Sequence, residues 1–79
     1  MNSNYRTLLI ELDDLIGKKV TEGYLDAVFE KYYWQCMGFT LDNRLIYIES
    51  PMGKEIDLVI ETDEYGIITI KKIEKRFWD

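Results

Sequence analysis

Carboxylates are the side chains in this sequence whose spacing could support chemistry. Glu55, Asp57 and Glu61 are separated by even numbers of positions, so an extended strand places them on one face, and Asp63 and Glu64 follow shortly after. Carboxylates grouped in this way can bind a divalent cation or act as an acid–base pair. The glycine and terminal glutamate of a calcium-binding loop are missing, so a solvated acidic surface is the better interpretation.

Other groups with catalytic potential are scarce. The chain has one cysteine, Cys36, and no histidine, so it can form neither an internal disulfide nor a Cys/His zinc site. Cys36 falls on the apolar face of a predicted helix, which favours a buried, inert thiol over a nucleophile that lacks a histidine to activate it. The five glycines are scattered, so there is no glycine-rich phosphate loop. We therefore predict no catalytic residue, no metal and no cofactor, and expect that the protein is not an enzyme.

Charge is unevenly distributed along the 79 residues. The formal net charge is −5; residues 39–66 carry seven acidic and two basic residues, whereas residues 67–79 carry four basic and two acidic ones. The basic C-terminal segment also contains Phe77 and Trp78, and such a mixture can bind single-stranded nucleic acid. Lysines also protect an edge strand, and a terminal aromatic pair can fold back onto the core. The negative net charge of the whole chain disfavours nucleic acid as the partner.

The elements that must position these residues begin with two amphipathic helices. Apolar residues recur at steps of three and four over residues 5–16, and Gly17 is the expected stop. A second helix is expected to begin at Thr21, which can cap it, and to end near Gly38. Its apolar face is formed by Leu25, Val28, Phe29, Tyr32 and Cys36.

After Gly38 the period changes to two, which is typical of strands. The predicted strands cover residues 39–41, 44–50, 55–61 and 67–73. Turn-forming residues separate them, with glycines at positions 53 and 66. The sequence therefore predicts one α+β domain over residues 1–79, with two N-terminal helices packed on one face of a four-stranded antiparallel meander (ααββββ).

The predicted turns also fix a register for the sheet. They place Ile48 opposite Ile56, Ile60 opposite Ile68, and Leu58 opposite both Ile46 and Ile70, all on one face. A slip of one residue at any turn would destroy this agreement, so we expect this face to be the one that the helices cover.

Two aromatic residues near the end of the second helix are candidate binding residues. A helix that continued through Trp34 would place it opposite Leu25, on the polar side, with Tyr33 flanking the apolar stripe. An exposed tryptophan there would suit an interface anchor. The alternative is that the helix ends earlier and Trp34 lies beneath the next segment of chain.

The second face of the predicted sheet supplies the other candidates. Leu45, Tyr47, Val59 and Ile67 fall among charged residues on this face, which suggests a surface for a partner or for a second copy of the chain. The alternative is that the segment containing Phe77 and Trp78 covers it. The candidate partner-binding residues are Tyr33, Trp34, Tyr47, Glu55, Asp57, Val59, Glu61, Asp63 and Glu64.

From these observations we predict a small acidic protein–protein interaction module. The favoured function is an inhibitor or regulator that binds a basic cleft of a larger protein, for example one that processes nucleic acids, in the manner of phage or bacterial anti-defence proteins, immunity proteins or antitoxins. The alternatives are a nucleic-acid-binding regulator that uses the basic C-terminal segment, and a homo-oligomeric structural component. The sequence has no secretory signal and no apolar run long enough to span a membrane, so a cytoplasmic location without membrane attachment is expected.

Overall fold

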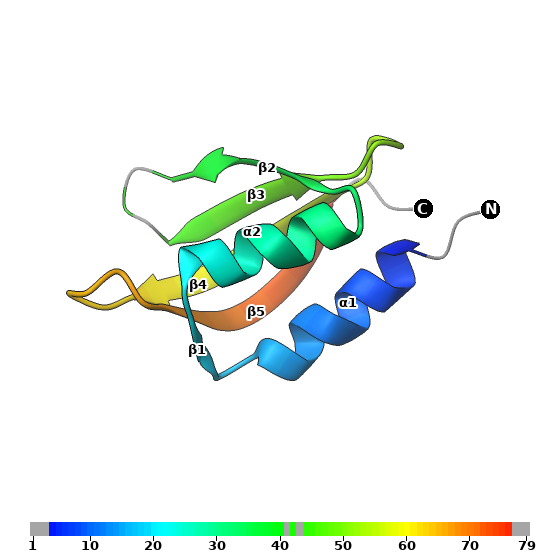
Figure 1. The fold of residues 1–79 in the computed structure, drawn as a ribbon. Coiled ribbons are helices and arrows are strands. Elements are labelled where there is room, and N and C mark those ends of the chain that lie inside the picture. The colour runs from blue at the N-terminus through cyan, green and yellow to red at the C-terminus, as the bar shows by residue number, and fades with distance from the viewer. Residues whose placement is uncertain (1–3, 41, 43, 77–79) are drawn as a thin grey trace.

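The computed structural model describes residues 4–40, 42 and 44–76 of the chain (Figure 1). Within them the chain forms two helices, α1 (Asn4–Leu15) and α2 (Glu22–Lys31). The strands are β1 (Lys19–Val20), β2 (Gln35–Phe39), β3 (Leu45–Glu49), β4 (Glu55–Thr62) and β5 (Ile68–Arg76). They pair antiparallel in one sheet, in the order β1-β5-β4-β3-β2.

The α+β fold and its antiparallel meander are confirmed, but the predicted number of strands is wrong. β2, β3, β4 and β5 are consecutive neighbours, as expected, but β2 covers Gln35–Phe39 instead of the predicted residues 39–41. β1 is an additional strand, which lies between the two helices in the sequence. Gly17 ends the first helical segment with φ 83°, and its N–H donates to the Ile70 carbonyl (2.9 Å), which brings the chain alongside β5. A strand of two residues has no periodicity, so the sequence pattern could not reveal β1.

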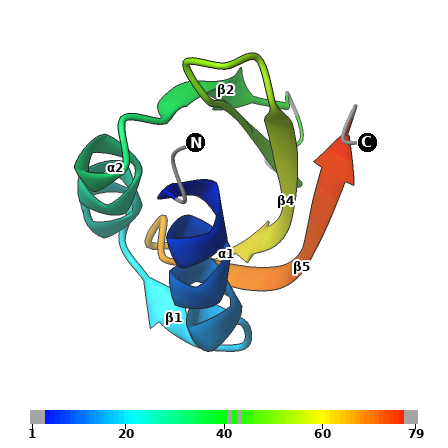
Figure 2. The ribbon, with the colours of Figure 1, turned by 90° about the vertical axis from the view of Figure 1, so that its right-hand side faces the viewer.

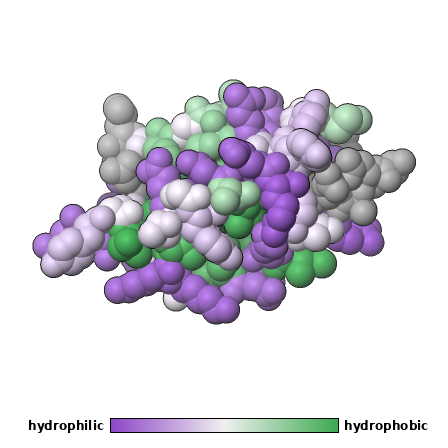
Figure 3. Space-filling view, viewed as in Figure 1, coloured by the Kyte–Doolittle hydropathy of each residue, from purple (hydrophilic) through white to green (hydrophobic). Residues whose placement is uncertain are grey.

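Both helices lie on the same face of the sheet, which curls around them (Figure 2). The space between the two layers is filled by the core. Its buried side chains are Leu8, Leu12, Leu25, Val28, Phe29, Trp34, Ile46, Ile48, Ile56, Leu58, Ile60, Ile68 and Ile70. The outer surface of the helix side is largely hydrophilic, with hydrophobic residues in small separate areas (Figure 3).

The end of α2 corrects the expectation that this helix extends to Gly38. The N–H of Tyr33 donates to the Glu30 carbonyl (3.0 Å), and the N–H of Trp34 donates to the Phe29 carbonyl (2.9 Å). Tyr33 has φ 62°, so the helix ends in a Schellman motif with a left-handed residue. Glycine is usual at that position, because the left-handed conformation costs other residues about 1–2 kcal/mol.

The Schellman motif also decides the position of Trp34. The chain turns inward after Tyr33, and Trp34 joins the core with only 4% of its surface exposed. The interpretation of Trp34 as a surface anchor on the polar side of the helix is therefore wrong, and the alternative, a tryptophan beneath the following chain, is correct. Cys36 consequently lies in β2 rather than in α2.

The hairpin turns are held by the side chain that precedes each of them. Thr40, Ser50 and Asp63 each accept two backbone N–H bonds from the turn that follows, at 2.9 to 3.2 Å. Gly53 and Gly66 take up the left-handed conformation, with φ 86° and 81°. These local bonds explain why the sequence located the turns correctly, since they require particular residues at particular positions.

The register between β3 and β4 is as predicted, but that between β4 and β5 is not. Ile46 lies opposite Leu58 and Ile48 opposite Ile56, whereas Leu58 lies opposite Ile73 instead of Ile70. Two features cause the difference.

The first feature is the β4–β5 turn, where Thr62 pairs with Ile68, so that Ile60 lies opposite Ile70 instead of the expected Ile68. The second is a bulge beside Val59 and Ile60 that leaves Lys71 as an extra residue in β5. The bulge keeps Ile73 on the core face despite the three-residue step from Ile70.

Candidate interaction surface

The face of the sheet that points away from the helices, here called the open face, gathers most of the predicted site residues. Pairing across the strands places the residues of this face in rows. One row contains Leu45, Val59 and Lys72, and the next contains Tyr47, Asp57 and Glu74. The third row contains Glu49, Glu55 and, on β5, Arg76.

The apolar part of the open face runs through its middle. Leu45 and Val59 lie directly opposite each other, Tyr47 follows on β3, and all three are half-buried. Ile67, also half-buried, extends this strip toward the β4–β5 turn. Phe77 and Trp78, which were the alternative cover for this face, lie outside the described residues.

The acidic part of the open face lies toward the turn between β3 and β4. Here Glu49 is directly opposite Glu55, and Asp57 is directly opposite Glu74. Basic residues share these rows, since Glu74 lies 3.6 Å from Lys72 and Glu55 is also opposite Arg76 of β5. Asp57 is only 8% exposed, whereas Glu49 and Glu55 are half-buried and Glu74 is exposed. The carboxylates that a partner can reach are therefore chiefly those of Glu49, Glu55 and Glu74.

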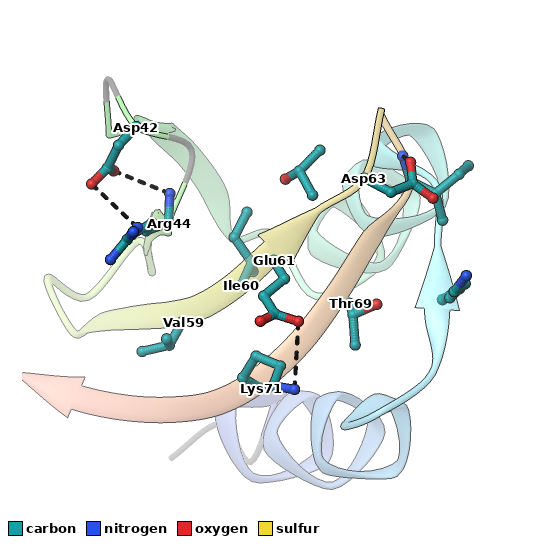
Figure 4. Close-up of a pocket in the computed structure, with 11 residues that line it drawn as sticks. Asp42, Arg44, Val59, Ile60, Glu61, Asp63, Thr69 and Lys71 are labelled. Atoms are coloured by element: carbon teal, nitrogen blue, oxygen red, sulfur yellow. Dashed lines mark hydrogen bonds and ion pairs between the residues drawn. The ribbon is translucent and has the colours of Figure 1, made fainter. Parts of the chain in front are cut away.

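A hollow of about 940 Å³ lies at the other end of the open face, between the β2–β3 and β4–β5 turns (Figure 4). It is lined by Lys19, Asp42, Arg44, Val59, Ile60, Glu61, Thr62, Asp63, Ile67, Thr69 and Lys71. A second depression, with Leu45 and Tyr47 in its wall, shares Asp42, Arg44 and Val59 with the first. The two depressions therefore lie next to each other on the open face.

Charges of both signs surround this hollow. Arg44 lies 3.7 Å from Asp42, and Lys71 lies 3.5 Å from Glu61 (Figure 4). The side chains of both pairs are at least half exposed, so these pairs contribute little to stability and are easily exchanged for charges on a bound molecule.

The pKa of the Asp42 carboxyl, at the rim of this hollow, is lowered below its ordinary value. The hydroxyl of Thr40, which donates to Asp42 Oδ1 at 2.7 Å, is the main cause of its lowered pKa. The backbone N–H of Arg44 donates to the same oxygen at 3.2 Å, and the charge of Arg44 acts in the same direction. Asp42 therefore keeps its negative charge at the rim of the hollow.

The remaining predicted site residues are distributed over other places. Asp63 uses one carboxylate oxygen to hold the β4–β5 turn, and Glu64 is exposed in that turn. Tyr33 is exposed at the opposite end of the sheet, and Trp34 is in the core. The structure thus brings together Tyr47, Glu55, Asp57, Val59 and Glu61 on the open face.

Sequence reasoning missed several residues of this surface. The predicted register of β3 and β4 already places Glu49 opposite Glu55, so the signal for Glu49 was present. Glu74 and Lys72 reach the open face only because of the bulge, which the spacing of Ile68, Ile70 and Ile73 could have indicated.

Cys36 is half-buried beside the core, and burial raises the pKa of its thiol. Among residues 4–40, 42 and 44–76, no three side chains of the kinds that bind metals come together in a group. Neither helix in the described part of the chain has the length and apolar content required to span a membrane.

Comparisons with protein-family models, with curated protein sequences and with solved structures find no match to this chain.

Proposed function

We propose that this protein is an interaction module that binds a larger protein with a basic surface, and that the open face is its binding surface. The observation that carries the proposal is the half-buried apolar strip of Leu45, Tyr47 and Val59 on the open face, beside the rows that contain Glu49, Glu55, Asp57 and Glu74. Carboxylates grouped beside an apolar strip present negative charge that complements a cationic partner surface.

The apolar strip supports the same proposal. Leu45, Tyr47 and Val59 lie at the centre of the open face, and charged residues surround them. Protein interfaces commonly have an apolar centre and a polar rim. A surface required only to contact water would not need this arrangement.

The proposed role is that of an inhibitor or regulator. An acidic module is steered by its charge toward a basic cleft, and such steering accelerates association. Basic clefts are common in proteins that act on nucleic acids, since they must bind phosphate backbones. Anti-defence proteins, immunity proteins and antitoxins work in this way, and we place the protein in this functional class by analogy with them.

Affinity capture of the tagged protein from its own host, followed by mass spectrometry, tests the proposal. We expect the parent chain to retain a protein with a basic surface, and added salt to weaken retention. Glu49→Lys should reduce retention, because it reverses one carboxylate of an opposed pair. Asp14→Lys makes the same change of charge on the exposed side of α1 and should retain the partner as well as the parent does.

Two outcomes contradict the proposal. One is equal retention by the parent and Glu49→Lys. The other is tight binding of single- or double-stranded DNA or RNA in a gel-shift assay at physiological salt, which would favour the alternative of a nucleic-acid-binding regulator.

A further inference from the structure

The outer edge of β5, on the side away from β4, is paired along only part of its length. β1 covers Ile68 and Thr69, and the next residue, Ile70, forms a bridge with Ile16 and accepts the N–H of Gly17 (2.9 Å). In the part of the chain that the structure describes, no strand borders positions 71–76 on that side. Figure 2 shows that the C-terminal part of β5 extends away from β1. The unpaired stretch is about 20 Å long, which is enough for a short strand.

The pairing with β4 determines which backbone groups face this outer edge. Opposed residues of an antiparallel ladder alternate between pairs that exchange hydrogen bonds and pairs whose backbone groups point away from each other. The N–H of Ile60 donates to the Arg44 carbonyl (2.8 Å), away from β5, so Ile60 and Ile70 form a pair of the second kind. Leu58 and Ile73 are the next such pair beyond the bulge. The N–H and C=O of Ile73 therefore point outward, where no described strand pairs with them.

The side chains along this edge are mostly basic. Positions 71–76 carry four basic residues and one acidic residue, in a chain whose net charge is −5. Lys71, Lys72 and Lys75 are exposed. Lys71 lies 3.5 Å from Glu61 and Lys72 lies 3.6 Å from Glu74, in exposed ion pairs that are easily exchanged for other carboxylates. The edge thus combines outward backbone groups with local positive charge.

We propose that the outer edge of β5, over positions 71–76, is a docking site for an extended acidic segment of a partner protein, which pairs with it as an additional strand. Strand addition of this kind takes its affinity from main-chain hydrogen bonds, here to Ile73, and its specificity from side chains. Carboxylates of the segment would face the lysines of β5, and opposite charges across a ladder stabilise the pairing. The inference goes beyond the proposed function, because it uses a different surface and a partner segment of opposite charge.

A second copy of the chain does not suit this edge. Antiparallel pairing of two β5 strands would bring the same lysines toward one another, and like charges opposed across a ladder are unfavourable. Lysines on an edge strand protect against pairing of this kind. Charge complementarity therefore selects an acidic segment over β5 of another copy.

The test uses a soluble peptide of alternating glutamate and valine as the probe. A peptide of alternating lysine and valine reverses the charge, and the glutamate peptide methylated at every backbone nitrogen keeps the charge but cannot donate main-chain hydrogen bonds. Affinities are measured by isothermal titration, and amide hydrogen exchange of the labelled protein locates the contact. We expect the glutamate peptide to bind and to slow exchange of the Ile73 amide, and each of the other two peptides to bind about tenfold more weakly or not at all.

A pair of matched variants tests the role of charge at the edge. Lys72→Glu should weaken the glutamate peptide about two- to fivefold, because it places a carboxylate beside the docked segment. Arg44→Glu is the control, because Arg44 is also exposed, also lies close to one carboxylate (3.7 Å from Asp42), and is on the other side of β4. It makes the same change of charge and should leave the affinity unchanged.

Several outcomes would overturn the inference. These are no binding of the glutamate peptide, equal binding of its methylated form, equal binding of the lysine peptide, or an equal effect of Lys72→Glu and Arg44→Glu. Protection of the Ile73 amide in the protein alone, together with a dimer in sedimentation equilibrium, would show that a second copy occupies the edge.

Discussion

The two faces of this sheet differ in what their residues do for the fold. The face beneath the helices presents Ile46, Ile48, Ile56, Leu58 and Ile60, all of them buried. The open face carries both apolar and charged side chains on the same two strands, and it places Glu49 opposite Glu55. The contrast fixes the register, because a slip of one residue would bury the acids and expose the core. Register alone, however, requires neither an apolar strip nor opposed carboxylates on the open face.

The comparison therefore separates residues that maintain the fold from residues that are available for binding. Substitutions on the covered face should act on stability. Substitutions on the open face should act on binding and leave stability nearly unchanged or improve it.

The largest expected effect is that of Trp34→Ala. Trp34 belongs with the covered face, since it is packed in the core after the end of α2. Truncation of a buried tryptophan costs about 3–5 kcal/mol, which is a large part of the stability of a domain this small. We expect the melting temperature to fall by roughly 10 °C or more. A fall in melting temperature of only a few degrees, measured by circular dichroism, would contradict the burial of Trp34 in the core.

The next largest effect is the difference in stability loss between alanine substitutions at two neighbouring residues of β4. Leu58→Ala should destabilise the protein by about 2–5 kcal/mol, because Leu58 is fully buried beneath the helices. Val59→Ala, on the open face, should cost about 1 kcal/mol or less. Urea denaturation of both variants measures the difference directly. Equal losses would mean that the open face is as important for folding as the covered one.

A smaller effect of opposite sign is expected for Glu49→Lys. The substitution converts a like-charge pair with Glu55 into an opposite-charge pair, so the free energy of unfolding should increase by about 0.2–1 kcal/mol. Added salt should reduce the difference from the parent, because it screens the repulsion in the parent and the attraction in the variant. Destabilisation by this substitution would show that Glu49 has a structural role.

The smallest effect concerns Cys36, the thiol beside the covered face. Burial raises its pKa in the folded protein, so less thiolate is present at a given alkaline pH than in the unfolded chain. The corresponding stability is fully present below the ordinary thiol pKa and is lost as the pH rises through the folded value. A disulfide reagent should therefore modify the folded protein more slowly than the urea-unfolded protein at the same pH. Equal rates would show that Cys36 is exposed.

Most of the covered face could be predicted from the sequence, because period-two alternation and residue-specific turns determine it together. The turns at Ser50 and Asp63 are held by bonds within a few residues, so their signals are local. The β4–β5 register could not be obtained in the same way, because the turn pairs Thr62 with Ile68 and is followed by a bulge whose only trace is the spacing between Ile70 and Ile73.

The candidate site was less predictable, for a different physical reason. The position of Trp34 depends on where α2 ends, and that end is fixed by a tyrosine in a conformation that favours glycine. Sequence periodicity cannot anticipate such a stop. The open face was identified because its residues follow the pairing of β3 with β4, which the turn at Ser50 sets.

The most direct test of the open face as the binding surface is a retention measurement with the double variant Leu45→Thr/Val59→Thr. These opposed residues form the centre of the apolar strip; threonine favours strands at both positions, is close in shape to Val59 and is smaller and more polar than Leu45. If the open face binds the partner, retention in affinity capture should fall about tenfold, the ratio that corresponds to about 1.4 kcal/mol, while the variant stays folded. Undiminished retention by a folded double variant would contradict the account.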